Sequence, residues 1–556
     1  MRSKSLFWIT CAGIAAALAG PGSVHAQSLA PAALSGQVSS PEEGAMEGVL
    51  VSARKDGSNM TVTVVTDGKG RYSFPADRIE PGHYTIAIRA TGFSLDSPKA
   101  VDVTGSGSKA DIKLAKADDL EAQLSNAEWL ISAPGQDSVK ANLTNCVGCH
   151  TLRRVFTSVH NADEFKQVFQ RMGTYSPGTM PVHPQRLLPG PRGQRAPIPQ
   201  SRVDTVADWL ASVDTRLGDK LAYPIRALPR PTGESTKVII TEYDLPRKQA
   251  QPHDVVVGPD GMVWYSDFAN PFVGFMDPKT GKVTDIPIPV LKPEEPKGSL
   301  DLEVDPHGDL WLAMMYQAGI AKIDGKTHQV TTYPFPKEWQ SPSSQASMVS
   351  PQHDDVDGKV WTNNQEMHDV YRLDLKTGKY ENLGDVKDAS GKQVRGYGMP
   401  TDRQNDVYLL DFGDARIAKM DAKTRHTAIY STPTAGSRPR RGRVDGQDRL
   451  WFAEYGANHI GMFDPNTKKI REWQMPTPRS DPYDVSVPTR NGEVWTGSML
   501  TDRVSRLDLE TEKITDYLLP RSTNIRRVFV EDDGPRPVLW VGSNHGASIV
   551  KVEPLD

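Results

Sequence analysis

Leu450 to Pro465 read LWFAEYGANHIGMFDP, and this stretch is one copy of a unit that recurs through the second half of the chain. Each copy has a short apolar strand with an aromatic residue, a loop, and a second apolar strand that ends in a tight turn. The aromatic residue recurs at Trp264, Trp311, Trp361, Tyr408, Trp451, Trp495 and Trp540, at spacings of 47, 50, 47, 43, 44 and 45 residues. A repeat length of roughly 40 to 50 residues with about four strands is typical of a β-propeller. The repeats therefore predict a seven-bladed β-propeller over residues 237–556.

The strand that precedes the first copy predicts how the ring closes. The last copy ends at Ile549 to Val552 without an outer strand, and an unpaired strand, Val238 to Tyr243, lies ahead of the first copy. We expect this strand to complete the seventh blade, because pairing the two ends leaves no open strand edge.

The repeat resembles the streptogramin (virginiamycin B) lyase family of propellers. The likeness rests on LWFAEYGANHIGMFDP and on ITEYDLP at Ile240 to Pro246, and it covers residues 237–556. Family members perform a metal-assisted elimination on a lactone ester, with a base histidine in a Pro-His turn that follows a glutamate in a late blade. Here Pro252-His253 lies in the first blade, Gln251 replaces the glutamate, and the late blade has Asp481-Pro482-Tyr483. The resemblance thus implies the fold, while these departures argue against the lyase reaction.

Polar side chains gather at one face of the expected propeller, which we call the mouth. The loop that enters each innermost strand and the loop that leaves the second strand open on this face. The entering loops carry His253, Leu300, His353, Met399, Arg441, Tyr483 and Arg526, and the leaving loops carry Asp267, Gln317, Asn364, Asp411, Glu454, Ser498 and Asn544. Histidines and carboxylates suit a divalent ion such as Mg²⁺, and arginines suit an anionic ligand.

The candidate catalytic residues at the mouth are His253, His353, Arg441, Glu454 and Tyr483. The alternative is that these loop residues only bond neighbouring blades, because polar loop tips are common on any surface.

A second motif, Asn145-Cys146-Val147-Gly148-Cys149-His150, has the spacing of a covalent haem c site. The thiols of Cys146 and Cys149 add to the haem vinyl groups, and His150 binds the iron as the proximal ligand. A structural zinc site needs four protein ligands, and a thioredoxin-like centre does not need His150. The only other cysteine is Cys11. We therefore expect one covalent haem c.

The residues around this motif, 118–220, resemble a small class I cytochrome c domain. A helix is expected over residues 118–131, ahead of the haem-binding turn. Asn161 to Glu164 has the form of a capping box and predicts the start of a middle helix. Apolar residues at helical spacing predict a closing helix from Val203 to Leu217.

Two methionines are candidates for the distal iron ligand. Met180 lies in a loop before Pro181, where the resemblance places the ligand, and Met172 lies on the middle helix. The Pro- and Arg-rich stretch from Pro184 to Pro199 departs from the compact loop of the family, so Met172 stays open as the alternative.

Residues 33–116 read as short strands separated by turns and predict a β-sandwich. TDGKGRYSF at Thr66 to Phe74 and PGHY at Pro81 to Tyr84 resemble the carboxypeptidase-regulatory-like (transthyretin-like) domain. Such domains serve as spacers or adaptors, so we assign no chemistry to this one. A Pro-containing linker, residues 221–236, is expected between the haem domain and the propeller.

Residues 1–26 have the pattern of an export signal. Arg2 and Lys4 precede an apolar run, and Val24-His25-Ala26 forms a small-x-small cleavage site. We therefore expect a periplasmic or secreted bacterial protein with no transmembrane segment after signal removal. The formal net charge of -4 gives no electrostatic footprint for nucleic acid.

Three functions are compatible with the sequence. The first is an exported electron-transfer protein with haem c, a redox partner protein, and a small-molecule or polymer ligand at the mouth. The second is a metal-dependent carbon–oxygen lyase with an auxiliary cytochrome, and the third is a non-catalytic binding protein. The haem motif favours the first, because covalent haem has no evident use in elimination or in binding alone.

Overall fold

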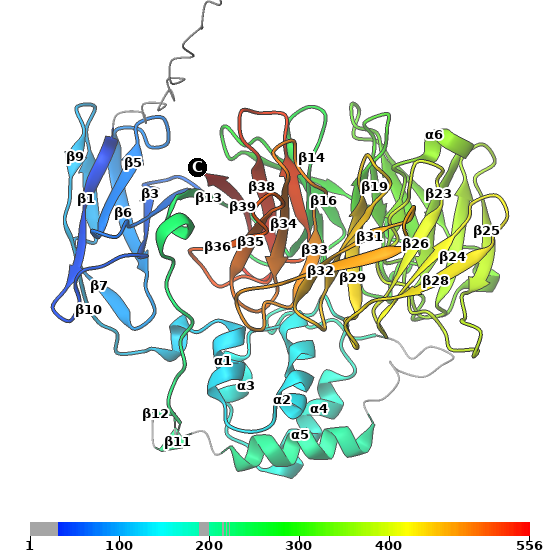
Figure 1. The fold of residues 1–556 in the computed structure, drawn as a ribbon, viewed down its shortest axis with the longest axis horizontal. Coiled ribbons are helices and arrows are strands. Elements are labelled where there is room, and N and C mark those ends of the chain that lie inside the picture. Colours follow the sequence, from blue (N-terminus) through cyan, green and yellow to red (C-terminus); the bar gives the residue numbers. More distant parts are fainter. Residues whose placement is uncertain (1–31, 188–198, 214–215, 218–219, 222, 556) are drawn as a thin grey trace, which may run out of the picture.

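The computed structural model describes residues 32–187, 199–213, 216–217, 220–221 and 223–555 (Figure 1). The expected export signal lies outside these residues, as does most of the stretch from Pro184 to Pro199. Within the described residues the protein is mainly β, as the sequence predicts. No helix among them is long and apolar enough to span a membrane.

The N-terminal residues form the expected β-sandwich. One sheet pairs β1 with β2, β5, β9 and β10, and β10 with β7; the other has the order β4-β3-β6-β8. Apolar side chains such as Leu34, Val51 and Phe74 fill the space between the sheets. The strands are β1 (Ala32–Ser40), β2 (Gly44–Ala45), β3 (Leu50–Lys55), β4 (Met60–Val65), β5 (Arg71–Pro75), β6 (Gly82–Arg89), β7 (Phe93–Ser97), β8 (Ala100–Val103), β9 (Ser108–Lys109) and β10 (Ile112–Lys116).

Seven sheets make up the propeller in the described part of the chain, one for each repeat. The repeated aromatic side chain is at most 1% exposed in every blade, so each blade is built around it. Blade 1 contains β14 (Pro252–Val257), β15 (Val263–Asp267), β16 (Phe272–Met276) and β17 (Val283–Pro287). Blade 2 contains β18 (Leu302–Val304), β19 (Leu310–Ala313), β20 (Gly319–Ile323) and β21 (Val330–Pro334). Blade 3 contains β22 (Val349–Ser350), β23 (Lys359–Asn364), β24 (Asp369–Asp374) and β25 (Lys379–Asp385).

The remaining blades follow the same plan. In blade 4 two isolated bridges, Gly396 to Asp411 and Thr401 to Val407, replace a regular innermost strand. Blade 4 contains β26 (Val407–Asp411), β27 (Arg416–Met420) and β28 (Thr427–Ser431), and blade 5 contains β29 (Pro439–Val444), β30 (Leu450–Glu454), β31 (His459–Asp464) and β32 (Lys469–Gln474). Blade 6 contains β33 (Pro482–Val485), β34 (Glu493–Ser498), β35 (Arg503–Asp508) and β36 (Ile514–Leu518). Blade 7 contains β37 (Val528–Glu531), β38 (Val538–Ser543), β39 (Ser548–Pro554) and β13 (Val238–Asp244).

Strand β13 closes the ring and also joins the propeller to the sandwich. Its seven residues pair with β39 from Val238–Pro554 to Asp244–Ser548, which confirms the predicted closure. Its other edge pairs with β4 from Ile239–Val64 to Tyr243–Met60. Blade 7 and one sandwich sheet are therefore a single eight-stranded sheet, a junction that the sequence did not predict.

A compact helical module lies between the sandwich and the propeller in the chain. The predicted helix over residues 118–131 is wrong as a single element, because Ser125 and Glu128 form a capping box that starts α1 at Asn126. The closing helix ends at Ser212, earlier than the predicted Leu217. The helices are η1 (Glu121–Gln123), α1 (Asn126–Ser132), α2 (Asp137–Lys140), η2 (Ala141–Gly148), α3 (Arg153–Phe156), α4 (Ala162–Met172) and α5 (Gln200–Ser212), and β11 (Arg216–Leu217) pairs with β12 (Lys220–Leu221).

The expected linker is anchored to the helical module and to the propeller. Leu228 is buried, and its N–H donates to the Glu128 carboxylate at 2.8 Å. The Arg503 guanidinium donates to the Pro229 carbonyl at 2.8 Å. The linker ends in η3 (Gly233–Thr236), and the propeller also contains η4 (Lys337–Trp339) and α6 (Asp354–Asp357).

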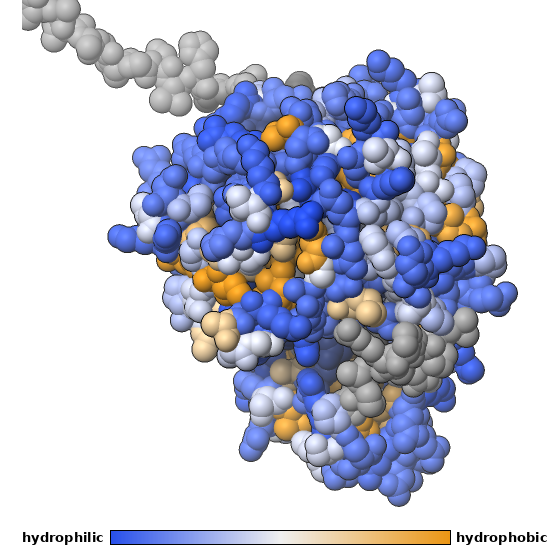
Figure 2. Space-filling model, turned by 90° about the vertical axis from the view of Figure 1, so that its right-hand side faces the viewer, coloured by the Kyte–Doolittle hydropathy of each residue, from blue (hydrophilic) through white to orange (hydrophobic). Residues whose placement is uncertain are grey.

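The helical module covers one end of the propeller, and α6 lies at the opposite end (Figure 1). The Ala127 N–H donates to the Leu500 carbonyl at 2.9 Å, and one apolar core contains module residues such as Leu130 together with Tyr455 and Tyr483 of the propeller. On the face in Figure 2, hydrophilic residues predominate and hydrophobic ones form separate patches.

Candidate functional site

The Cys146–His150 segment folds as one tight turn at the end of η2. The N–H groups of Cys149 and His150 both donate to the Cys146 carbonyl, at 3.1 and 3.3 Å. His150 Nδ1 lies 2.9 Å from the Thr151 carbonyl, so Nδ1 carries the proton and Nε2 keeps its lone pair. Burial lowers the pKa of His150, which favours the neutral imidazole. A neutral imidazole oriented through its second nitrogen is the form that binds a metal ion.

The two thiols of this turn fit covalent haem attachment. Cys146 and Cys149 are not joined by a disulfide. Burial raises the pKa of Cys146 to about 12, so the group is a thiol and lacks the low pKa of a reactive thiolate. These residues fit a haem c site, because two thiols can form thioether bonds and one histidine can bind iron.

The loop with Met180 crosses this turn. Cys149 Sγ lies 3.8 Å from the Ser176 carbonyl and 3.9 Å from that of Pro177. Met180 is half-buried in a tight turn with His183, in which each N–H donates to the other residue's carbonyl. Met172 is the last residue of α4 and is 38% exposed. The geometry thus favours Met180 as the methionine that could reach the iron.

Both the turn and the methionine loop rest on the propeller mouth. Asn524 Nδ2 donates to the Val147 carbonyl at 2.8 Å, and Gln251 Nε2 donates to the Gly178 carbonyl at 3.1 Å. A Cβ at Gly178 would lie 2.4 Å from the Phe268 carbonyl oxygen, so only glycine permits this approach. The helical module therefore covers the mouth with its candidate haem site facing inward.

A chain of hydrogen bonds runs through the mouth from Tyr397 to Asp254. His253 Nδ1–H donates to Asp254 Oδ1 at 2.6 Å, and His253 Nε2 lies 3.3 Å from the Tyr483 hydroxyl, which also bonds the Tyr397 hydroxyl. Burial lowers the pKa of His253 to about 4, so its imidazole is neutral at pH 7. His253 can therefore accept a proton through Nε2 while Asp254 holds the ring in place.

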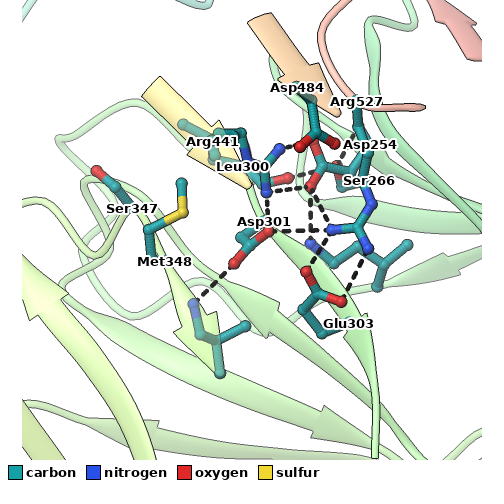
Figure 3. Close-up of polar contacts among 12 residues, drawn as sticks. Asp254, Ser266, Leu300, Asp301, Glu303, Ser347, Met348, Arg441, Asp484 and Arg527 are labelled. Atoms are coloured by element: carbon teal, nitrogen blue, oxygen red, sulfur yellow. Dashed lines mark hydrogen bonds and ion pairs between the residues drawn. The ribbon is translucent and has the colours of Figure 1, made fainter. Parts of the chain in front are cut away.

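Beneath this chain, a buried ion-pair network crosses the central channel (Figure 3). Arg441 donates to both carboxylate oxygens of Asp254, at 2.8 and 2.9 Å, and to Asp301. Arg527 forms two hydrogen bonds with Glu303. Burial would raise the pKa of Asp254, but Arg441, His253 and Arg527 together outweigh it and lower that pKa well below the usual value. Arg441 thus pairs with buried carboxylates inside the channel. The prediction that it lies at the mouth is therefore wrong.

His353 lies at the other end of the channel. Ser350 pairs with Trp361 in blade 3 as Val256 pairs with Trp264 in blade 1, so the residue equivalent to His253 is Ser347. His353 follows the strand, bonds the Thr401 hydroxyl at 2.9 Å, and lines a cavity of about 90 Å³ with Arg443. The structure therefore separates His353 from His253.

Strand register also identifies two mouth residues that the sequence analysis missed. Tyr397 and Arg440, not Met399 and Arg441, occupy the positions equivalent to His253 in blades 4 and 5. Each lies 11 residues before the repeated aromatic residue, as His253 does, so this spacing could have found them. The Arg440 guanidinium packs on four aromatic rings, the nearest being Tyr483 at 3.9 Å from its centroid.

His545 is a third residue that the sequence analysis missed. It lies in the loop after β38 and is half-buried, with both ring nitrogens shielded from solvent. Burial, and then the Arg526 guanidinium, lower its pKa to about 3, and the Gly148 backbone and His150 lie close enough to affect it. A second neutral histidine thus adjoins the candidate haem turn. Only its place one residue after Asn544 in a leaving loop marks it in the sequence.

Glu454 faces its own blade. The carboxylate is fully buried and lies 3.7 Å from His459 Nδ1, beside Glu472. Of the five candidate residues, the structure thus brings His253 and Tyr483 together, places Arg441 and His353 beside one cavity in the channel, and places Glu454 within blade 5.

Two parts of the chain match known families. Residues 384–555 match the Virginiamycin B lyase family, and residues 33–115 match the carboxypeptidase regulatory-like domain. Neither match includes the helical module. No curated protein matches the chain at the level of sequence.

Solved structures support the propeller fold. A streptogramin B lyase is 20% identical, with a TM-score of 0.50 over 58% of this chain and 100% of its own. Virginiamycin B lyase from Staphylococcus aureus is 19% identical, with a TM-score of 0.48 over 57% of this chain and 99% of its own. At 20% identity, the likeness to the streptogramin B lyase structure shows a propeller fold of that kind and no shared chemistry.

Proposed function

We propose that this protein is an exported haem c electron-transfer protein whose haem edge lies against the mouth of the propeller. Cys146 and Cys149 would hold the haem, and His150 and Met180 would bind its iron, which would carry one electron. The observation that carries the proposal is the hydrogen bond from Asn524 to the Val147 carbonyl, within the turn that bears both thiols. Because thioether bonds are short, the haem edge must lie where this turn lies, at the mouth.

The mouth residues would control the charge beside the haem edge. Arg526 lies within 6 Å of the ring centroids of Phe268 and Tyr483, and its guanidinium approaches the Gly148 carbonyl at 3.5 Å. His253 is neutral and is hydrogen-bonded to Tyr483, so it can take up a proton when the local charge becomes more negative. In a buried site such charges act strongly, because little water screens them.

The module also offers a surface for the expected redox partner protein. Five large hydrophobic residues of the described chain are markedly exposed, and three of them, Val159, Met172 and Val182, belong to the module. Val182 lies two residues after Met180, on the loop that would cover the iron. Exposed apolar side chains near a haem would favour docking of a partner close enough for electron transfer.

Covalent attachment is the first test. Haem should stay with the polypeptide through denaturation and acid-acetone extraction, and the double substitution Cys146→Ala, Cys149→Ala should give colourless protein. Extractable haem in the unmodified protein would disprove covalent attachment.

The mouth is tested with a matched pair of histidine variants. His253→Ala should change the midpoint potential of the haem and the dependence of that potential on pH, because it removes the base beside Tyr483. His353 lies at the opposite end of the channel, so His353→Ala should change neither the midpoint potential nor its dependence on pH. Equal effects from both variants, or none from His253→Ala, would contradict a role for the mouth.

A lyase-like reaction is the second candidate function. The observation that favours it is the neutral, buried His253 with its Asp254 partner, a suitable base on a propeller that resembles the lyases. The experiment is to assay Mg²⁺-dependent ring opening of a cyclic peptide lactone. Turnover that disappears in His253→Ala and persists in the haem-free cysteine variant would support this candidate over electron transfer.

A further inference from the structure

Blade 5 contains a cluster of two carboxylates and one imidazole that the proposed function does not use. Glu454 ends β30, His459 begins β31 opposite it, and Glu472 lies on β32. Their potential ligand atoms all lie within 4.8 Å of one another. These three atoms are close enough to bind one ion together.

Glu454 is the unusual member of the cluster. It is 0% exposed, and neither of its carboxylate oxygens has a hydrogen-bond partner among the described residues. The Thr434 N–H and hydroxyl hold Glu472, at 3.0 and 2.6 Å. A buried carboxylate without a hydrogen-bond partner, next to a second carboxylate, needs a compensating positive charge.

Two other blades show how the chain compensates a similar carboxylate pair. In blade 1, Asp267 and Asp285 occupy the positions of Glu454 and Glu472, and Arg247 bridges them with contacts of 2.6 Å to each. Thr434 stands in the place of Arg247, since each lies five residues before the proline that starts the innermost strand. Blade 5 therefore has the carboxylates without this arginine.

Blade 4 uses a different arginine for the same purpose. Arg416 pairs with Asp411 across the strands, as His459 pairs with Glu454, and it bonds Asp411 and Asp388 at 2.6 and 2.5 Å. In blade 5 this position is a histidine, which can bind a metal ion as arginine cannot. Blade 5 thus has no arginine at either position: Thr434 replaces the Arg247 of blade 1, and His459 replaces the Arg416 of blade 4.

We propose that Glu454, His459 and Glu472 bind a divalent transition-metal ion, of the Zn²⁺ or Mn²⁺ class, in blade 5. One imidazole nitrogen and two carboxylates form a mixed donor set that these ions accept. His459 and Glu472 are partly exposed, so an ion can reach the site from solvent. Tyr455, which follows Glu454, packs in the core shared with the helical module. The ion would therefore stabilise the blade where the module rests on it.

The test is Zn²⁺ and Mn²⁺ binding by the untagged, full-length protein after removal of metals with a chelator. Titration calorimetry with ZnCl₂ should show one bound ion per chain beyond any haem iron, and the midpoint temperature of unfolding should rise by several degrees in excess Zn²⁺. Mn²⁺ should compete for the same site, with loss of the free-ion paramagnetic resonance signal.

Two variants and one control distinguish this site from other metal-binding groups. His459→Arg copies blade 4 and should abolish binding while keeping the metal-free protein at least as stable, and Glu454→Gln should abolish binding as well. His426→Ala removes an exposed histidine of blade 4 and should leave binding unchanged. Binding that survives His459→Arg, or no binding at all by the unmodified protein, would overturn the proposal.

Discussion

Met180 and Met172 differ in their surroundings, and this difference makes the distal ligand testable at the level of one residue. Met180 is half-buried in the loop that crosses Cys149, whereas Met172 is 38% exposed at the end of α4. Met180→Ala should therefore abolish the weak near-infrared band of histidine–methionine haem ligation in the oxidised protein, and Met172→Ala should keep it. The reverse result would assign the ligand to α4, and loss of the band in neither variant would exclude both methionines.

Residues whose chemistry depends on local spacing could be predicted from the sequence. Cys146, Cys149 and His150 lie within one turn, so their spacing alone fixes their proximity. Residues whose place depends on strand register were harder to predict. Tyr483 has the expected position, but His353 lies past its strand, because blade 3 has an innermost strand of only two residues and continues into α6. An irregular loop changes the register, and the repeat length does not reveal it.

At the level of elements, β13 has two partners, and only one of them was predictable. The repeat count showed that the seventh blade lacked an outer strand, which β13 supplies. Its second edge pairs with β4, and nothing in the alternation of either strand specifies that partner, because backbone hydrogen bonds carry no side-chain signal. An open edge on β13 would have invited pairing with another chain, so the sandwich protects it.

A buried ion pair also joins the sandwich to blade 6. Arg89 of β6 bonds the fully buried Asp502 carboxylate at 2.6 Å and the Leu519 carbonyl at 2.8 Å. Arg89→Met should lower the free energy of unfolding by about 3 kcal/mol, because it leaves a buried carboxylate without its partner. Calorimetry should then show the sandwich unfolding before the propeller.

Two further variants test whether the buried charge causes the effect. Adding Asp502→Asn to Arg89→Met should recover part of the loss, since the uncompensated charge is removed. Arg71→Met breaks an exposed pair with Asp67 in the same sandwich and should cost less than about 1 kcal/mol. A similar loss from Arg71→Met and Arg89→Met would show that the junction does not depend on Asp502.

At the level of the whole molecule, the helical module, the linker and the sandwich all fasten to the same propeller. The helical module closes the mouth, and the linker binds α1 through Leu228 and blade 6 through Pro229. The surroundings of the proposed haem therefore depend on how these parts of the chain pack together. The sequence predicted each part from its own pattern, but no pattern marks the contacts between parts, such as the single amides that donate to carbonyls of another part.

Two propeller amides provide the test of this arrangement, because Asn524 and Gln251 hold the haem turn and the methionine loop. The double variant Asn524→Ala, Gln251→Ala should loosen the module, so that trypsin cleaves it faster. Its haem potential should fall, since water at the haem edge stabilises the more highly charged ferric state. Asn382→Ala, on the outer strand β25, is the control and should change neither measurement.

If cleavage quickens while the potential stays constant, the module docks on the mouth but the haem edge points elsewhere. If neither changes, these amides do not hold the module, and the remaining apolar contacts through Leu130 and Tyr455 must be sufficient.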